Sequence, residues 1–421
     1  MIIANISTPL LGLVDTAVMG HLDNVQFLAA VAIATLIFSF LFWGFGFLRM
    51  GTTSLSSQAF GANNPLELKA ILLRALLIAC SLALGILLLQ KPIAALCFYL
   101  LDSHKDLEIL AQQYFFIRIW SAPATLCQYV ILGWFLGCQN TKSPLAIIIS
   151  TNLCNIGLDL LLVNYYGMNA DGVALASVIS EYIGLALAIL LLIKNIPHSH
   201  QSLSWPLIFQ VDKIKAMLLI NSHLFVRTLC LIFTFGFFTV QGEKLGSTIL
   251  AANAILLNFQ TFMAYALDGF AHAAEALIGR ALGANNKRLF QQSLKSTALW
   301  SLVVALLFTL FYSYAGKDII NSLTHLNPAR EQAYEFIPWV IALPLISFIS
   351  FLMDGVFIGA ALSKQMRDTI LLSLFIVFLP AWYFSQHLGN HGLWFALTLF
   401  MLSRSLIMLG IYLYYKNKLL N

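Results

Sequence analysis

The sequence predicts an all-α integral membrane protein with twelve transmembrane helices, arranged as two pseudo-symmetric six-helix halves. Its composition is the first reason: 60% of the 421 residues are hydrophobic and 10% are charged, against about 25% charged residues in an average soluble domain. Its apolar runs are also long enough to cross a bilayer, which takes ~20 helical residues. Finally, two stretches of the chain repeat at one constant offset. These observations exclude a water-soluble protein.

The apolar runs fall into two groups of six. In lipid, only helices and closed barrels satisfy their own backbone, and runs of this length predict helices. The first six lie at roughly 3–20, 26–50, 67–90, 109–136, 144–164 and 173–193. The second six lie at roughly 214–240, 248–278, 289–315, 332–361, 369–387 and 391–415. Several exceed ~25 residues, which predicts tilt or continuation beyond the bilayer.

The basic residues of the connections predict the orientation. Twelve Lys and Arg lie on the side of the two termini and five on the other side. The positive-inside rule therefore predicts that both termini are cytoplasmic. The chain starts at Met1 directly inside an apolar run, so no cleavable signal peptide is predicted.

A shift of 222 residues aligns positions 20–64 with 242–286 without a gap and gives 13 identities in 45 positions. The identities include the motif GANN, at 61–64 and 283–286, which predicts a helix end entering a turn. The same shift places the GxFxG motif of 133–137 on that of 355–359. Chance agreement between apolar helices does not explain polar matches at one common offset.

The repeat predicts how the chain is divided. We expect an N-terminal six-helix half at 1–194, a cytoplasmic linker at 195–212 and a C-terminal six-helix half at 213–421. Because each half has an even number of spans, the two halves share one topology. Halves that rock about a central site are a common architecture of alternating-access carriers.

Four stretches carry a family resemblance. They are NISTPLLGLVDTAVMGHL at 5–22, IRIWSAPA at 117–124, LDGFA at 267–271 followed by Glu275-Ala276, and MDGVFIGA at 353–360. Together and in this order, they resemble the multidrug and toxic compound extrusion (MATE) family, in its DinF branch. The resemblance implies a secondary antiporter of a bacterial inner membrane, which exports amphipathic, often cationic aromatic compounds in exchange for H⁺ or Na⁺.

Six acidic residues lie within spans, where a charge costs ~2.5–3.5 kcal/mol and needs a reason. They are Asp15, Asp159, Glu181, Asp268, Glu275 and Asp354. On the fifth span, Asn152, Asn155 and Asp159 are spaced i, i+3 and i+7 and so share one face. Amides beside a carboxyl group can form a hydrogen-bond network that changes when the carboxyl is protonated.

The resemblance implies that the first-helix Asp and the fifth-helix Asn and Asp face one cavity. We therefore expect Asp15 to be the principal proton acceptor, with Asp159 and Asn155 as its partners. A structural hydrogen bond between helices is the alternative. Branches with a Na⁺ site in the second half use an acidic residue on the seventh helix, where this chain has Arg227, and this favours H⁺.

The other charged residues leave two interpretations open. Glu181 either lines the same cavity or pairs with Arg118. In the second half, Asp268, His272 and Glu275 share one helix face, and a structural pair with Arg227 is preferred to a coupling role. A metal site would need ligands from a second helix. Asp354 is a candidate functional residue only because it lies in a family motif. A candidate second-half polar cluster consists of Arg227, Asp268, Glu275 and Asp354.

The nearest alternative function is a flippase for a lipid-linked precursor, a related two-half carrier that would need basic cavity residues to meet pyrophosphate. The candidate first-half cavity is mainly acidic, with Arg118 the exception, and this favours cationic cargo. A membrane enzyme is disfavoured because no HExxH, GxSxG or paired-carboxylate motif occurs. We predict no cofactor, no metal and no nucleic-acid partner, and we expect a monomer.

Overall fold

The structure is a computed structural model, and it describes residues 25–101, 105–196 and 205–419. Helices joined by short turns make up these ranges, and no strand occurs in them. The chain forms two compact units, the first ending at Leu218 and the second starting at Leu219. This division lies just beyond the predicted linker, inside the first long helix after it.

The first unit contains most of the shorter helices. They are α2 (Val25–Gly44), α3 (Phe47–Gly61), α4 (Pro65–Leu88), α5 (Gln90–Leu101), α6 (Lys105–Arg118), η1 (Ile119–Ser121), α7 (Ala122–Gly137), α8 (Lys142–Asp159), η2 (Leu160–Tyr165), α9 (Ala170–Asn195) and α10 (Trp205–Ile208). In this unit α7 packs against α3, α4 and α9, and α8 packs along α9.

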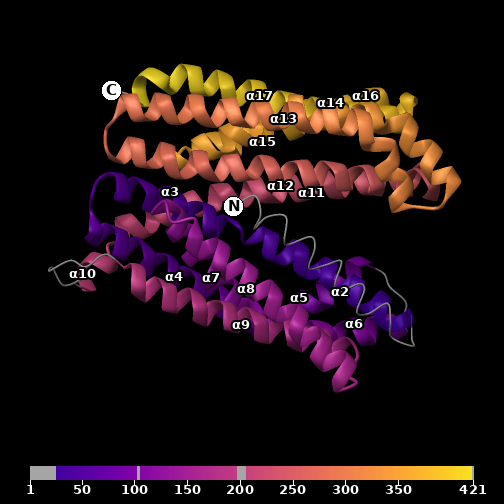
Figure 1. Cartoon of the computed structure of the whole chain (residues 1–421), viewed down its shortest axis with the longest axis horizontal. Helices are drawn as coiled ribbons and strands as arrows, with labels where there is room; N and C mark the ends of the chain where they lie inside the picture. The colour runs from indigo at the N-terminus through magenta and orange to yellow at the C-terminus, as the bar shows by residue number, and fades with distance from the viewer. Residues whose placement is uncertain (1–24, 102–104, 197–204, 420–421) are drawn as a thin grey trace. The chain divides into compact units, whose positions relative to one another are not determined.

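The second unit is built from longer helices. They are α11 (Val211–Lys244), which starts in the first unit, α12 (Ser247–Gly283), α13 (Lys287–Leu323), α14 (Asn327–Gly359), α15 (Ser363–Leu372), η3 (Ser373–Phe378), α16 (Leu379–Ser385), η4 (Gln386–Leu388) and α17 (Asn390–Leu419). Within this unit α12, α13, α14 and α17 lie side by side (Figure 1). Its core is rich in aromatic rings, such as Phe238 against Trp394 at 4.9 Å.

The described part of the chain holds eleven helical segments that are long and apolar enough to cross a membrane. They match the last eleven predicted runs, and the predicted span at 3–20 lies outside the described residues. The helices α12 and α13 have 37 residues each and are thus about 55 Å long, well over the ~30 Å hydrocarbon core. Their length agrees with the expected tilt or continuation beyond the bilayer.

The GANN motifs form the same turn in both units. Asn63 and Asn285 have positive φ angles of 50° and 47°, which end the preceding helix in the left-handed conformation. The next residue caps the following helix: the side chain of Asn64 accepts a bond from Glu67 N, and that of Asn286 from Leu289 N. The predicted structural role of both motifs is confirmed.

The GxFxG motifs mark a close helix crossing that recurs in both units. A Cβ atom on Gly133 of α7 would lie 2.4 Å from the carbonyl oxygen of Arg49 on α3. A Cβ atom on Gly355 of α14 would lie 2.2 Å from the carbonyl oxygen of Ala271 on α12. Arg49 and Ala271 are themselves 222 positions apart, so the sequence repeat is a repeat of contacts.

The helix α3 extends well beyond the predicted end of its span at residue 50. Beyond residue 50 most of its polar residues are Ser or Thr, and several of their hydroxyl groups bond to the helix's own carbonyls, for example from Thr52 to Leu48 O (2.7 Å) and from Ser56 to Thr52 O (2.6 Å). Hydroxyls satisfied in this way can be buried at a helix interface. Small polar residues therefore continue a buried helix where hydropathy alone predicts its end.

The short helix α10 is attached to the first unit by Arg74 of α4, which is 2% exposed. The guanidinium donates to the carbonyl oxygens of Leu207 (2.5 Å) and Ile208 (3.0 Å) and pairs with Glu67 at 2.9 Å. Lys213 pairs with the same Glu67 oxygen at 3.4 Å. Part of the predicted linker, helix α10, is thus hydrogen-bonded to helix α4.

Candidate functional site

A buried polar cluster lies between α8 and α9 in the first unit. The buried face of α8 includes Thr151, Asn155 and Asp159, spaced by four residues. Asp159 is fully buried and Asn155 is 2% exposed, whereas Asn152 is half-buried on the same helix. Two of the three residues predicted to share a face, Asn155 and Asp159, thus lie on the buried face of α8, and Asp15 lies outside the described residues.

The cluster also contains Ser177 and Ser180 of α9, both buried. Helix packing is close here, since a Cβ atom on Gly184 of α9 would lie 2.1 Å from Thr151 Oγ1. The π-helix η2 begins at Leu160, directly after Asp159. A π-helical turn shifts the direction of the following side chains, and such turns are frequent at functional sites.

The Asn155 amide links Asp159 to α9. Its Nδ2 donates to Asp159 Oδ2 at 3.0 Å, and its Oδ1 accepts from Ser177 Oγ and from Ser177 N, at 3.2 Å each. In this orientation both ends of the amide are hydrogen-bonded.

A second set of charges in the first unit centres on Glu181 of α9. Gln128 of α7 donates through Nε2 to both Glu181 Oε2 and the Glu181 carbonyl oxygen, at 2.8 Å each. Arg118 Nη2 lies 3.9 Å from Glu181 Oε1. Of the two interpretations of Glu181, the structure therefore shows the pairing with Arg118, and Gln128 joins the pair as a residue that the sequence did not single out.

The second unit carries a different arrangement around Asp354 of α14. Its Oδ2 atom accepts hydrogen bonds from Arg227 of α11 and from Arg404 of α17, the latter at 2.9 Å. All three residues are less than 10% exposed. One buried carboxylate is thus shared by two buried guanidinium groups.

We expected Arg227 to pair with an acidic residue of α12. The carboxylate that pairs with Arg227 in the structure is that of Asp354 on α14. Asp268 interacts electrostatically with Arg404, and Glu275 is buried at 1% exposure. Asp354 thus has a specific structural role that its motif alone did not reveal. Arg404 was missed, although a basic residue in the middle of an apolar run was a signal for it.

The structure offers no support for a metal site: in the ranges that it describes, no three His, Cys, Asp or Glu side chains gather closely enough to hold an ion. His272 is half-buried on α12, one turn from Asp268. The polar clusters of the two units consist of carboxyl, amide, hydroxyl and guanidinium groups. Such groups can exchange protons and bind organic ions.

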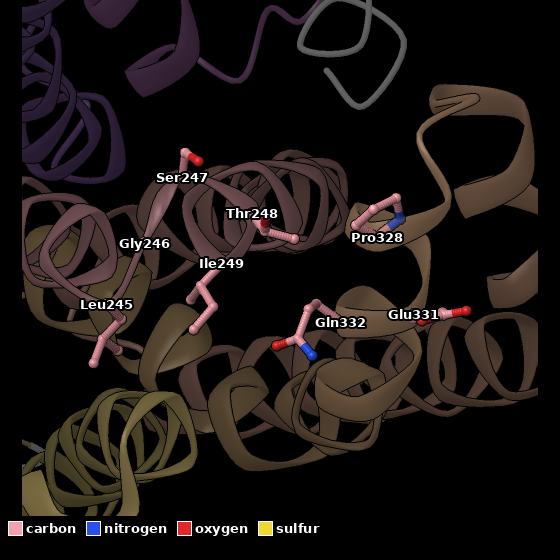
Figure 2. Close-up of a pocket in the computed structure, with 8 residues that line it drawn as sticks. All are labelled: Leu245, Gly246, Ser247, Thr248, Ile249, Pro328, Glu331 and Gln332. Carbon is pink, nitrogen blue, oxygen red and sulfur yellow. The ribbon is translucent and has the colours of Figure 1, made fainter.

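An open pocket of about 460 Å³ lies at the N-terminal end of α14. Figure 2 shows its residues, which come from the turn between α11 and α12, the start of α12 and the first turns of α14: Leu245, Gly246, Ser247, Thr248, Ile249, Pro328, Glu331 and Gln332. Asp354 follows Gln332 by about six helical turns, roughly 33 Å. The pocket is therefore separate from the Asp354 cluster.

Comparison with known proteins agrees with the repeat. One family model, described as MatE, matches the chain twice, at residues 1–161 and 224–384. The chain is 39% identical to DNA damage-inducible protein F (DinF) of Escherichia coli K12, over 98% of the chain and 90% of that relative. It is 24% identical to human multidrug and toxin extrusion protein 1, over 95% and 70%.

A solved structure with the same fold is a mutant of the Vibrio cholerae MATE transporter VcmN. The two structures superpose with a TM-score of 0.85, covering 100% of this chain and 94% of the other at 20% sequence identity. At this identity, the likeness concerns the fold. It agrees with the predicted all-helical architecture.

Proposed function

The chain belongs to the MATE family of membrane transporters, and from this premise we propose that it exports amphipathic organic compounds, cationic or aromatic, in exchange for H⁺. The cytoplasmic placement of both termini is part of the proposal and rests on the count of basic residues in the connections. Exchange would proceed by alternating access, in which a substrate site opens to each side of the membrane in turn. The proposed export role follows relatives that are named for extrusion.

The observation that carries the proposal is the buried hydrogen bond between Asn155 and Asp159. The Asn155 amide bonds to Asp159 of its own helix through Nδ2 and to Ser177 of α9 through Oδ1. A proton on Asp159 would add a hydrogen-bond donor to this group. We infer that proton loading changes the contact between α8 and α9, because an unsatisfied buried polar group would cost about 1–3 kcal/mol.

The second unit disfavours a Na⁺ site beside Asp354, and this argues against the Na⁺-coupled alternative that would use the second half. A Na⁺ site needs several oxygen ligands with negative charge to spare, as hard cations do in general. The Asp354 carboxylate already accepts bonds from two guanidinium groups. It is electrostatically compensated, and Arg227 and Arg404 would repel a second cation beside it.

Proton release from everted membrane vesicles on addition of ethidium tests the proposal. Asp159→Asn keeps the size of the side chain but cannot exchange a proton. We expect this variant to lose drug-driven proton release, and we expect the same of Asp15→Asn. The exposed Asp318→Asn is the matched control. Unchanged antiport in both Asp15→Asn and Asp159→Asn, at equal expression, would contradict the proposal.

The choice of ion is tested separately. With no proton gradient, Na⁺ replaces K⁺ in the medium, and ethidium efflux is followed by its fluorescence. The proposed coupling to H⁺ predicts no Na⁺-driven efflux. Robust efflux under a Na⁺ gradient would overturn the assignment of H⁺ while leaving the export function in place.

A flippase for a lipid-linked precursor is the second candidate, and Arg227 with Arg404 is the observation in its favour. Two buried guanidinium groups could bind a pyrophosphate. They already share one carboxylate, however, and the first-unit clusters are acidic or neutral apart from Arg118. Binding of an organic cation, rather than a pyrophosphate lipid, is the result that separates the candidates.

A further inference from the structure

Arg118 occupies a cation site in the first unit. Its guanidinium carbon lies 5.7 Å from the centre of the Phe38 ring and 5.6 Å from that of Phe42. The two rings belong to α2, stand 5.6 Å apart and are 4% and 7% exposed. A cation within ~6 Å of a ring centre is attracted by the negative face of the ring. The arginine thus sits where two aromatic faces meet.

A carboxylate completes this site and does not depend on the arginine for its position. Gln128 holds Glu181 through two 2.8 Å bonds, one to the side chain and one to the carbonyl. The ion pair of Glu181 with Arg118 is longer, at 3.9 Å. Arg118 itself is also bonded to the Ser121 hydroxyl. If Arg118 left, the rings and the carboxylate would stay in place.

The site is accessible in part. The side chain of Arg118 is 15% exposed and that of Glu181 is 21% exposed, whereas the rings behind them are buried. Both charged groups can thus be reached by a ligand. A guanidinium group is planar, delocalised and weakly hydrated. These are also the properties of a flat aromatic cation.

We propose that Phe38, Phe42 and Glu181 form a binding subsite for planar organic cations, and that Arg118 is its tethered occupant, which the transported cation displaces. The inference rests on the proposed export of cationic compounds and adds the place where the charge is bound. A tethered group competes at high effective concentration. Only cations with enough apolar surface to bind elsewhere as well would displace it, and this gives the site selectivity.

Ethidium binding to the purified protein, measured by fluorescence anisotropy, tests the inference. Arg118→Gln and Arg118→Met remove the competing charge, so we expect each to bind ethidium more tightly, by about tenfold. Adding Glu181→Gln should cancel this gain. Nile red, an uncharged dye, should show no such change. Lys317→Gln is the matched control, because Lys317 also lies over a ring, 5.5 Å from that of Tyr334, in the second unit.

Weaker or unchanged ethidium binding in folded Arg118→Gln and Arg118→Met would overturn the subsite, and so would a gain that persists with Glu181→Gln. These outcomes are distinct from failure of the proposed function. If the wild type exports ethidium in exchange for protons but the Arg118 variants bind ethidium no more tightly, the proposed function stands and the subsite is wrong. A Glu181-dependent gain in binding, with no coupled export, would do the reverse.

Discussion

The buried acids of the two units have opposite surroundings. In the first unit, Asp159 accepts a hydrogen bond from the neutral Asn155 amide. In the second unit, Asp354 is held by Arg227 and Arg404. The first carboxyl group is thus bonded to a neutral partner, whereas the charge of the second is compensated by two guanidinium groups.

This difference arises on one repeated scaffold. The GANN turns, the asparagine caps and the glycine crossings recur at the same offset in both units. A repeated scaffold with unequal chemistry indicates that the helix contacts were kept while the buried polar groups diverged. Coupling would then belong to the first unit, and the second-unit cluster would serve to hold the three helices α11, α14 and α17 together.

The largest expected effect concerns stability in the second unit. Asp354→Asn leaves two buried arginines without a carboxylate, and we expect it to destabilise the protein by roughly 3–5 kcal/mol. Thermal unfolding of the purified protein measures the loss. Asp159→Asn should cost less, since the asparagine can still bond to Asn155. Equal losses in the two variants would remove the contrast between the units.

A neutral replacement of the whole cluster sharpens this prediction. Arg227→Met, Asp354→Leu and Arg404→Met together leave no unpaired buried charge, so most of the lost stability should return. The three single variants, measured alongside, show whether the groups act as one unit. A triple variant as unstable as Asp354→Asn would show that the charges themselves are required.

The glycine crossings should be equally sensitive in both units. Gly133→Ala and Gly355→Ala each place a methyl group against a backbone carbonyl, at 2.4 Å and 2.2 Å. Such overpacking typically costs about 1–3 kcal/mol. Gly157→Ala and Gly236→Ala are the controls, because nothing lies within 4 Å of their added Cβ atoms. A loss of stability in only one of these two variants would show that the two crossings are not equivalent.

The smallest effects are expected at the caps. Asn64→Ala and Asn286→Ala each remove the side-chain acceptor of a helix N-terminus, which is worth about 1 kcal/mol. We expect similar drops in thermal stability for both. A cap variant that instead impairs transport at unchanged stability would give these turns a functional role beyond the structural one.

The spans were predictable because hydropathy sets their length and position, as for α9 and α17. The end of α3 was not, because Thr52 and Ser56 are polar by composition and become compatible with burial only through bonds to their own helix. The helix α5, at Gln90–Leu101, lies between two predicted spans and was missed. It is too short to produce a spanning signal.

The candidate site was predicted in part. The spacing of Asn155 and Asp159 indicated their shared face, since helical periodicity is local. The partners on other helices were not accessible in this way, because no local pattern relates Gln128 to Glu181 or Arg404 to Asp354. Both contacts depend on tertiary packing between helices that are far apart in the chain.

The most direct test of the central claim, that proton exchange belongs to the first unit, compares two variants in one assay. Ethidium-driven proton release is measured in everted vesicles for Asp159→Asn and for the neutral Arg227, Asp354 and Arg404 triple variant, at matched protein levels. The account predicts that Asp159→Asn abolishes proton release and that the triple variant retains it. Proton release that survives in Asp159→Asn and is lost in the triple variant would contradict the account.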